Sequence, residues 1–160
     1  EHFVTIRQKS LALPGVVALT HLVHRLGGYV SLVSNRDGSY RDASGSTLAA
    51  TIANLKQQNI VFDQVILANY KTSQHPSDKN PRFNAVIYGH YDSHEMVWSK
   101  RLPPHQVIAY FGDNIQDFPR FKQAAVDALP DDSKTYEVFG AGYFILPNPM
   151  YGSWEANRYH

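Results

Sequence analysis

Residues 29–38, with the sequence YVSLVSNRDG, decide the fold of this chain. The run from Tyr29 to Val33 is mainly apolar and β-branched, which is typical of a short strand buried on both faces. The polar residues 34–38 then stop the run, so they predict a loop at the carboxyl end of the strand. In open α/β sheets, ligands bind beyond that end of the strands.

Helices and strands alternate along the rest of the chain. Helical spacing of apolar residues predicts helices at about 15–26, after the capping residue Ser46, around Phe83–Ile87, and from the capping residue Asp117 to about Leu129. Apolar runs predict further strands at 65–68, 107–111 and 143–146. This alternation predicts an α/β fold of the Rossmann-like kind, a three-layer sandwich with a mostly parallel sheet.

Composition narrows the class of protein. The 160 residues are 43% hydrophobic, so we expect one domain over residues 1–160. Because 15 basic and 14 acidic residues nearly cancel and no basic run occurs, we expect no nucleic-acid partner. The absence of cysteine excludes disulfides, thiolate zinc sites and a cysteine nucleophile. Every apolar run is far shorter than the roughly 20 residues of a membrane-spanning helix, so no span is expected.

Two polar residues are candidates for binding a phosphoryl group. The hydroxyl of Ser34 and the amides after it follow a predicted strand, where N–H groups point outward and can hold an oxyanion. Lys79 can neutralise such a group electrostatically. Taken alone, the local sequence favours a turn position for Ser34 and a solvated surface position for Lys79.

Asp113 and Asp117 are four residues apart after another predicted strand. Carboxylates are ligands that Mg²⁺ prefers, and the ion commonly takes one or two of them together with several waters. The alternative is that Asp113 begins a turn while Asp117 caps a helix, and the spacing alone favours this alternative. The eight histidines show no zinc-binding spacing, so they receive no metal role.

Read in chain order, three stretches resemble the motifs of haloacid dehalogenase phosphatases. They are Val33–Arg36 (VSNR), Lys79 followed by Arg82-Phe83, and Gly112–Phe118 (GDNIQDF). The ending Ile145–Glu155 (ILPNPMYGSWE) resembles that of class C acid phosphatases, the bacterial lipoprotein type. The resemblance runs from roughly residue 7 to residue 155.

This resemblance implies a magnesium-dependent acid phosphatase that hydrolyses phosphate monoesters, including nucleotides, through an aspartyl-phosphate. By the same analogy, the protein is expected in the bacterial periplasm or at the outer membrane. The implied site residues are Ser34 and Lys79 for catalysis, Asn35, Arg36 and Tyr151 for substrate binding, and Asp113 and Asp117 for the metal. The family more often has Thr where this chain has Ser34, and both side chains supply an O–H donor.

One motif of the family is absent. Its nucleophile and its general acid lie in an Asp-x-Asp motif on the first, central strand, and the 160 residues contain no such motif. We therefore expect the sequence to lack that strand and to be the C-terminal part of a longer protein, since the strand's loss leaves unsatisfied sheet edges. The alternative is a non-catalytic phosphate-binding or interaction protein derived from the family.

Overall fold

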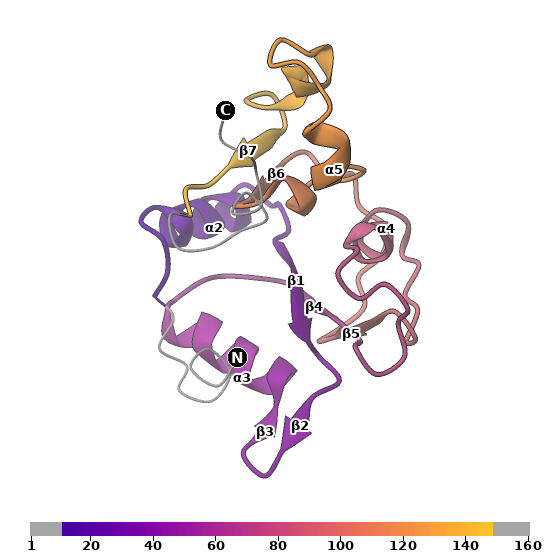
Figure 1. Cartoon of the computed structure of the whole chain (residues 1–160). Helices are drawn as coiled ribbons and strands as arrows, with labels where there is room; N and C mark the ends of the chain where they lie inside the picture. The colour runs from indigo at the N-terminus through magenta and orange to yellow at the C-terminus, as the bar shows by residue number, and fades with distance from the viewer. Residues whose placement is uncertain (1–10, 149–160) are drawn as a thin grey trace. The chain divides into compact units, whose positions relative to one another are not determined.

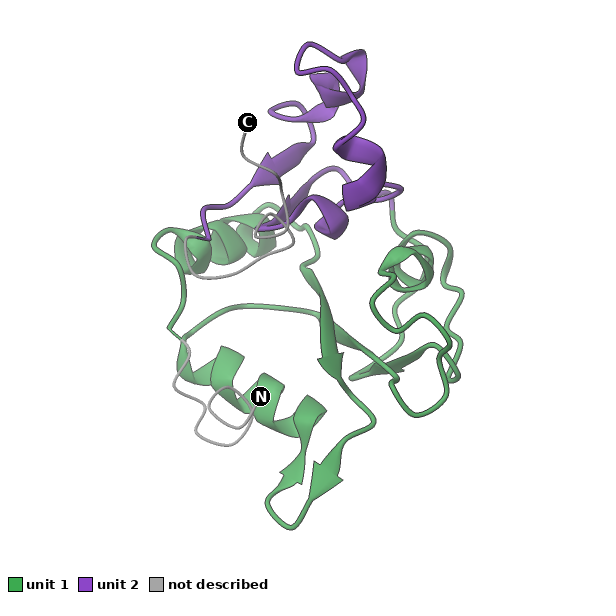
Figure 2. Ribbon diagram, viewed as in Figure 1, with its two compact units in different colours: residues 1–105 green, residues 106–160 purple. Residues whose placement is uncertain are grey.

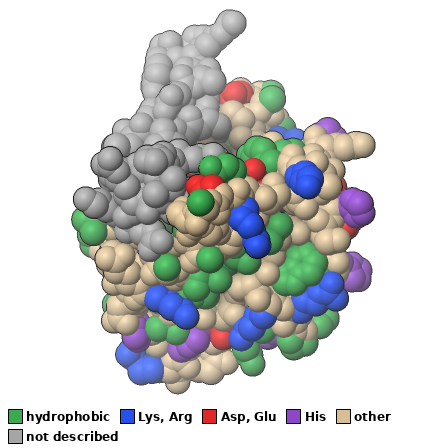
Figure 3. All heavy atoms as spheres, turned by 90° about the horizontal axis from the view of Figure 1, so that it is seen from below, with side chains coloured by type: hydrophobic (Ala, Val, Ile, Leu, Met, Phe, Trp, Pro, Cys, Tyr) green, Lys and Arg blue, Asp and Glu red, His purple; other side chains and the backbone are tan. Residues whose placement is uncertain are grey.

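The computed structural model describes residues 11–148. The chain divides into two compact units, Glu1–His105 and Gln106–His160, coloured separately in Figure 2. None of the helices described is long and apolar enough to cross a membrane. On the face seen in Figure 3, Lys and Arg side chains are scattered among apolar and neutral ones rather than gathered into one patch. The expectation of a single domain over 1–160 stays a prediction.

A three-stranded sheet forms the centre of the first unit (Figure 1), with strand order β1-β4-β5. Its strands are β1 (Ser31–Asp37), β4 (Gln64–Ala68) and β5 (Met96–Trp98). β4 pairs in parallel with β1 and antiparallel with β5, and all its residues are buried. Among residues 11–148 no strand pairs with the other edge of β1, and every residue of β1 is only half-buried.

Within residues 11–105, three helices and a small hairpin surround this sheet. They are α2 (Val16–Arg25), the hairpin strands β2 (Arg41–Asp42) and β3 (Gly45–Ser46), α3 (Thr47–Gln57) and α4 (Asn80–Tyr88). Ser46 caps α3 because its Oγ accepts a hydrogen bond from the Ala49 amide at 3.2 Å. α3 and α4 lie on opposite sides of the sheet (Figure 1), and Ala85 of α4 packs against Ile66 and Met96 in the core.

The second unit has less regular structure. β6 (Tyr110–Gly112) pairs in parallel with β7 (Tyr143–Ile145), and between them lie the 3-10 helices η1 (Ile115–Asp117) and η2 (Lys134–Val138) and the short α5 (Gln123–Val126). Phe118, 1% exposed, stacks on Tyr143 with ring centroids 5.2 Å apart and meets Phe139 edge-on. Aromatic packing, more than strand pairing, therefore fills the interior of this unit.

The structure confirms the α/β class and the predicted positions of α2, α3, α4, β4 and β7. Two predictions were partly wrong in the second unit. The strand expected at 107–111 begins only at Tyr110, and the long helix after Asp117 is reduced to α5. Pro119 lacks an amide donor and Arg120 has φ 68°, so a continuous helix cannot pass through this stretch. Asp117 consequently lies in η1 and does not cap α5.

Two further differences concern the first unit. The predicted loop at 34–38 is strand as far as Asp37, because Asp37 still pairs with Ala68 and the Gly38 amide donates to the Ala68 carbonyl at 2.8 Å. The sheet is mixed, since β5 runs antiparallel to β4. Strand β5 carried no signal in the sequence pattern. The three-layer sandwich stays a prediction.

Ile66 is the residue that tests this core most simply. It is 0% exposed at the centre of β4, so Ile66→Ala removes buried methylene groups and leaves a cavity. We expect a loss of about 2–5 kcal/mol in the free energy of unfolding, measured by urea denaturation with circular dichroism. The control Leu26→Ala changes a side chain that is 78% exposed and should cost less than about 0.5 kcal/mol. Equal losses for the two variants would contradict this core.

Candidate functional site

The end of β1 departs from regular pairing at a β-bulge. The register runs evenly from Ser31 opposite Gln64 to Ser34 opposite Leu67, but the next pair is Asp37 with Ala68. Residues 35–36 therefore have no partners on β4. Bulges of this kind re-aim side chains and are over-represented beside active sites.

Ser34 is the last regularly paired residue before this bulge. Its Oγ accepts a hydrogen bond from the Arg36 amide at 3.2 Å, as in a serine turn. Among residues 11–148 its O–H has no acceptor, so the hydroxyl remains a donor for a ligand. The turn position and the binding role, which seemed to be alternatives, are compatible in this geometry.

Arg82 connects α4 to the bulge of β1. Its Nη2 donates to Oδ1 of Asn35, and its Nη1 donates to the Pro76 carbonyl at 3.1 Å. The other end of the Asn35 amide donates to the Ser77 carbonyl at 3.1 Å. Strand β1 is thus tied to the segment that leads into α4, at whose N-cap position Lys79 lies.

The charge of Arg82 is poorly compensated. The side chain is 1% exposed, it forms no ion pair with a described carboxylate, and its Nε has no hydrogen-bond partner. Burial lowers the pKa of Arg82 to about 10, against the opposing charges of Asp78 and Glu95. Because Lys79 lies one helical turn before Arg82, this end of β1 has the cations and the hydroxyl donor suited to an oxyanion.

The three residues predicted to bind substrate are Asn35, Arg36 and Tyr151. Nη1 of Arg36 donates to Oγ1 of Thr51 at 3.1 Å, which holds this guanidinium toward α3. The Asn35 amide is engaged at both ends, as described above. Tyr151 lies outside the described residues. The binding roles of these three residues stay predictions.

The second unit contains the acidic pair. The Asp113 amide donates to Oδ2 of Asp117 at 3.1 Å, and Nδ2 of Asn148 donates to Oδ2 of Asp113. Burial, followed by the hydrogen bond and the charge of Asp117, raises the pKa of Asp113. Gly112 makes this approach possible, because a Cβ at this position would lie 2.3 Å from the Asp117 Cβ.

This pair fits a magnesium ion. The two carboxylates lie close together, and the raised pKa of Asp113 reflects burial and repulsion that a divalent cation would offset. The described part of the chain contains no cluster of three or more His, Cys, Asp or Glu side chains able to hold a metal. Magnesium does not require one, since it commonly takes one or two protein carboxylates and retains waters.

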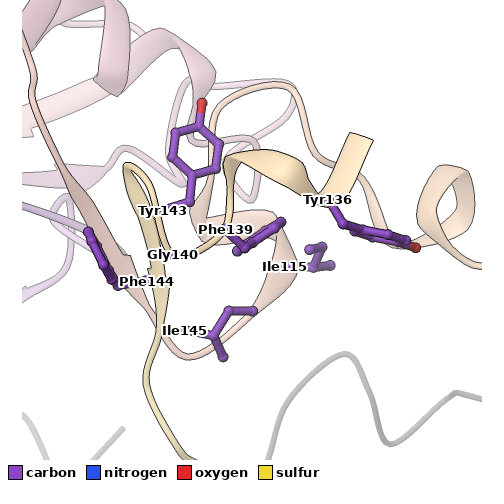
Figure 4. Close-up of a pocket in the computed structure, with 7 residues that line it drawn as sticks. All are labelled: Ile115, Tyr136, Phe139, Gly140, Tyr143, Phe144 and Ile145. Carbon is purple, nitrogen blue, oxygen red and sulfur yellow. The ribbon is translucent and has the colours of Figure 1, made fainter. Parts of the chain in front are cut away.

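An apolar hollow of about 530 Å³ lies within the second unit. It is lined by Ile115, Tyr136, Phe139, Gly140, Tyr143, Phe144 and Ile145 (Figure 4). Ile115 is two residues beyond Asp113, so the hollow is close to the acidic pair along the chain. Tyr136 and Phe139 were not singled out from the sequence, because η2 carries no recognisable motif.

The structure groups the predicted residues by unit. Ser34 and Lys79 belong to the first unit, whereas Asp113 and Asp117 belong to the second. The role of Arg82 as a connector was missed. Its spacing from Lys79 was visible in the sequence, but its partner Asn35 is 47 residues away.

Comparison with known proteins gives one family. Residues 1–154 match the family model described as the haloacid dehalogenase (HAD) superfamily, subfamily IIIB (acid phosphatase). The match covers nearly all of the 160 residues. No solved structure matches the chain.

The role of Gly112 can be tested by Gly112→Ala. The added Cβ would collide with Asp117, so we expect a loss of about 1–3 kcal/mol in the free energy of unfolding, measured by urea denaturation. Gly142→Ala is a matched control in the same unit, since the nearest atom to its Cβ is the Ile108 carbonyl oxygen at 3.7 Å. If Gly112→Ala were as stable as the control, Asp117 would not approach the strand end as described.

Proposed function

The chain belongs to the acid phosphatases of the HAD superfamily, subfamily IIIB, and we propose that it acts on phosphate monoesters with the help of Mg²⁺. Membership in this family indicates phosphatase activity. The magnesium requirement, the residue roles and the kind of ester are parts of the proposal.

The observation that carries the proposal is the composition of the strand end in the first unit. A buried guanidinium without an ion-pair partner lies there beside a hydroxyl whose proton has no acceptor among the described residues. In the proposal, the buried positive charge of Arg82 favours an anion at this strand end through its electric field, without contacting the anion. In the proposal the Ser34 O–H donates to a phosphoryl oxygen, and the ammonium group of Lys79 offsets the phosphoryl charge.

The acidic pair of the second unit has the second role in the proposal. Asp113 and Asp117 would hold Mg²⁺, with the Asn148 amide fixing the orientation of the Asp113 carboxylate. A bound magnesium ion supplies positive charge that stabilises the phosphoryl oxygens during transfer. The hydrogen bond from the Asp113 amide, at 3.1 Å, keeps the Asp117 carboxylate next to Asp113.

The proposed reaction has two steps. A carboxylate oxygen attacks phosphorus, the bond from phosphorus to the ester oxygen breaks, and the leaving oxygen takes a proton from a second carboxyl group. Water then attacks the aspartyl-phosphate, which releases inorganic phosphate and restores the carboxylate. Both carboxyl groups belong to the family's Asp-x-Asp motif, which the 160 residues do not contain. Turnover therefore needs an Asp-x-Asp motif that these 160 residues do not supply.

A second function is favoured by that same sequence observation. Without an Asp-x-Asp motif, the residues around Ser34 and Lys79 can bind a phosphate group but cannot complete the covalent step. In this case the protein is a phosphate-binding or interaction protein derived from the family. Phosphate affinity without turnover distinguishes it from the phosphatase.

The finer classification rests on the ending of the chain. Residues 145–155 resemble the ending of class C acid phosphatases, so we propose this class, nucleotides as substrates and a periplasmic or outer-membrane location. The aromatic lining of the hollow near Asp113 supports a substrate with a planar ring. Comparison of nucleoside and alkyl monophosphates as substrates, and fractionation of the source cells, test these points.

Magnesium dependence is the first test of the function. We expect a protein that combines this chain with an Asp-x-Asp motif to hydrolyse p-nitrophenyl phosphate with Mg²⁺. It should lose this activity in EDTA or upon Asp113→Asn, because each change removes metal binding. Isothermal titration with Mg²⁺ and a continuous colorimetric assay measure both effects. Asp127→Asn, which changes an exposed acid of the same unit, is the control and should behave as the unchanged protein does. Magnesium-independent turnover would contradict the assignment of the metal site.

Ser34→Ala tests the phosphate contact. Loss of one hydrogen bond to a charged ligand should weaken inorganic phosphate binding by about 10- to 100-fold, as measured by isothermal titration. Ser34→Thr retains the hydroxyl and should retain most of the affinity. Both proposed functions require phosphate binding, so this test applies to each of them. Unchanged affinity in Ser34→Ala would remove Ser34 from the site.

A further inference from the structure

Arg82 and Asn35 connect the end of β1 to the segment that leads to Lys79. The proposed function requires these two parts of the chain to keep a fixed position relative to each other. Asn35 directly follows Ser34 on β1, and Arg82 is one helical turn beyond Lys79 in α4. The Arg82 guanidinium donates to Asn35 Oδ1 and to the Pro76 carbonyl, while Asn35 Nδ2 donates to the Ser77 carbonyl. The hydrogen bonds therefore join the residue next to Ser34 with the segment just before Lys79.

Burial of the Arg82 guanidinium lowers the stability of the fold. The guanidinium is 1% exposed, its Nε finds no partner among the described residues, and Asp78 and Glu95 influence it without forming an ion pair. An apolar side chain at this position would remove the desolvation penalty and could fill the same space. Packing alone therefore does not explain an arginine at this position. A need for two hydrogen-bond donors, Nη1 and Nη2, in a fixed geometry explains it.

Other hydrogen bonds hold the start of the segment 69–79. Thr72 Oγ1 donates to the His94 carbonyl at 2.7 Å, and the Tyr70 amide donates to Asp37 Oδ1 of β1 at 3.4 Å. Residues 69–79 form no helix or strand, and they lead directly into the first turn of α4. Asn80 donates from its amide to Asp78 Oδ1 at 2.9 Å, which is a local bond within the segment. The bonds of Arg82 and Asn35 reach residues 76 and 77, so they hold the end of the segment that leads to Lys79 against β1.

We propose that Arg82 is a positioning residue that, through Asn35, holds the Lys79 segment against the Ser34 end of β1. The proposal rests on the proposed function insofar as the held residues bind phosphate. Arg82 itself does not touch the ligand in this proposal, because its side chain is buried beneath the bulge. The two-point contact is the essential feature, and a lysine, with a single ammonium group, cannot reproduce its geometry.

The experiment compares Arg82→Lys with the matched control Arg101→Lys. Arg101 is an exposed arginine of the same unit that lies over the Trp98 and Tyr91 rings and contacts neither segment. Hydrogen exchange followed by mass spectrometry reports on residues 69–80, and isothermal titration reports the affinity for inorganic phosphate. Asn35→Ala, which removes the same connection from the strand side, is a second variant should Arg82→Lys fold poorly.

We expect about tenfold faster exchange in residues 69–80 for Arg82→Lys and for Asn35→Ala, with exchange in β4 unchanged. Phosphate affinity should fall about tenfold or more in both variants. The double variant should lose no more phosphate affinity than the more affected single variant, because both changes break the same connection. Arg101→Lys should match the unchanged protein in both measurements.

The outcomes separate this inference from the proposed function. Unchanged exchange in residues 69–80 for both single variants would overturn the positioning role, and so would fully additive losses in the double variant. A uniform rise in exchange over the whole unit would indicate general destabilisation and would equally overturn it. If the unchanged protein bound no phosphate while exchange rose locally in the variants, the proposed function would fail and the positioning role would stand.

Discussion

The parallel pairing of β1 with the fully buried β4 is the constraint on which the first unit depends. Both strands end at the same edge of the sheet, so the segments that follow them must begin close together. The bulge after Ser34 then turns Asn35 out of the ladder, where it meets the guanidinium of Arg82 returning from α4. The candidate phosphate site is thus a consequence of strand pairing and one bulge, with the helix that follows β4 supplying its cations.

The two units place opposite charges at equivalent positions. Polar residues lie at the carboxyl end of β1 in the first unit and directly after β6 in the second. In the first unit the guanidinium of Arg82 is buried without an ion pair among residues 11–148, and in the second two carboxylates lie together with the pKa of one raised. Such unpaired charge lowers stability unless a ligand compensates it. An anion and a divalent cation, the two components of metal-assisted phosphoryl transfer, would compensate the two sites.

Local sequence determined much of this structure, and long-range contacts determined the rest. Strand β4 was predictable because it is a continuous apolar run, and α3 because Ser46 provides the oxygen that caps it. The helix expected after Asp117 failed where the proline and the positive φ of Arg120 interrupt the chain. Ser34 and Asp113 were found because each directly follows an apolar run that predicts a strand, although the structure places Ser34 within β1. The role of Arg82 depends on a partner 47 residues away, which no periodicity reveals.

The central claim is that the carboxyl end of β1 and the start of α4 together bind a phosphate group. The most direct measurement is titration of the ¹⁵N-labelled protein with inorganic phosphate, followed by two-dimensional NMR. The account predicts saturable shifts concentrated in the amides of residues 34–37 and 77–80, with β4 and the Trp98 region unaffected. Shifts elsewhere, or none at phosphate concentrations well above those that saturate known phosphate-binding proteins, would contradict it.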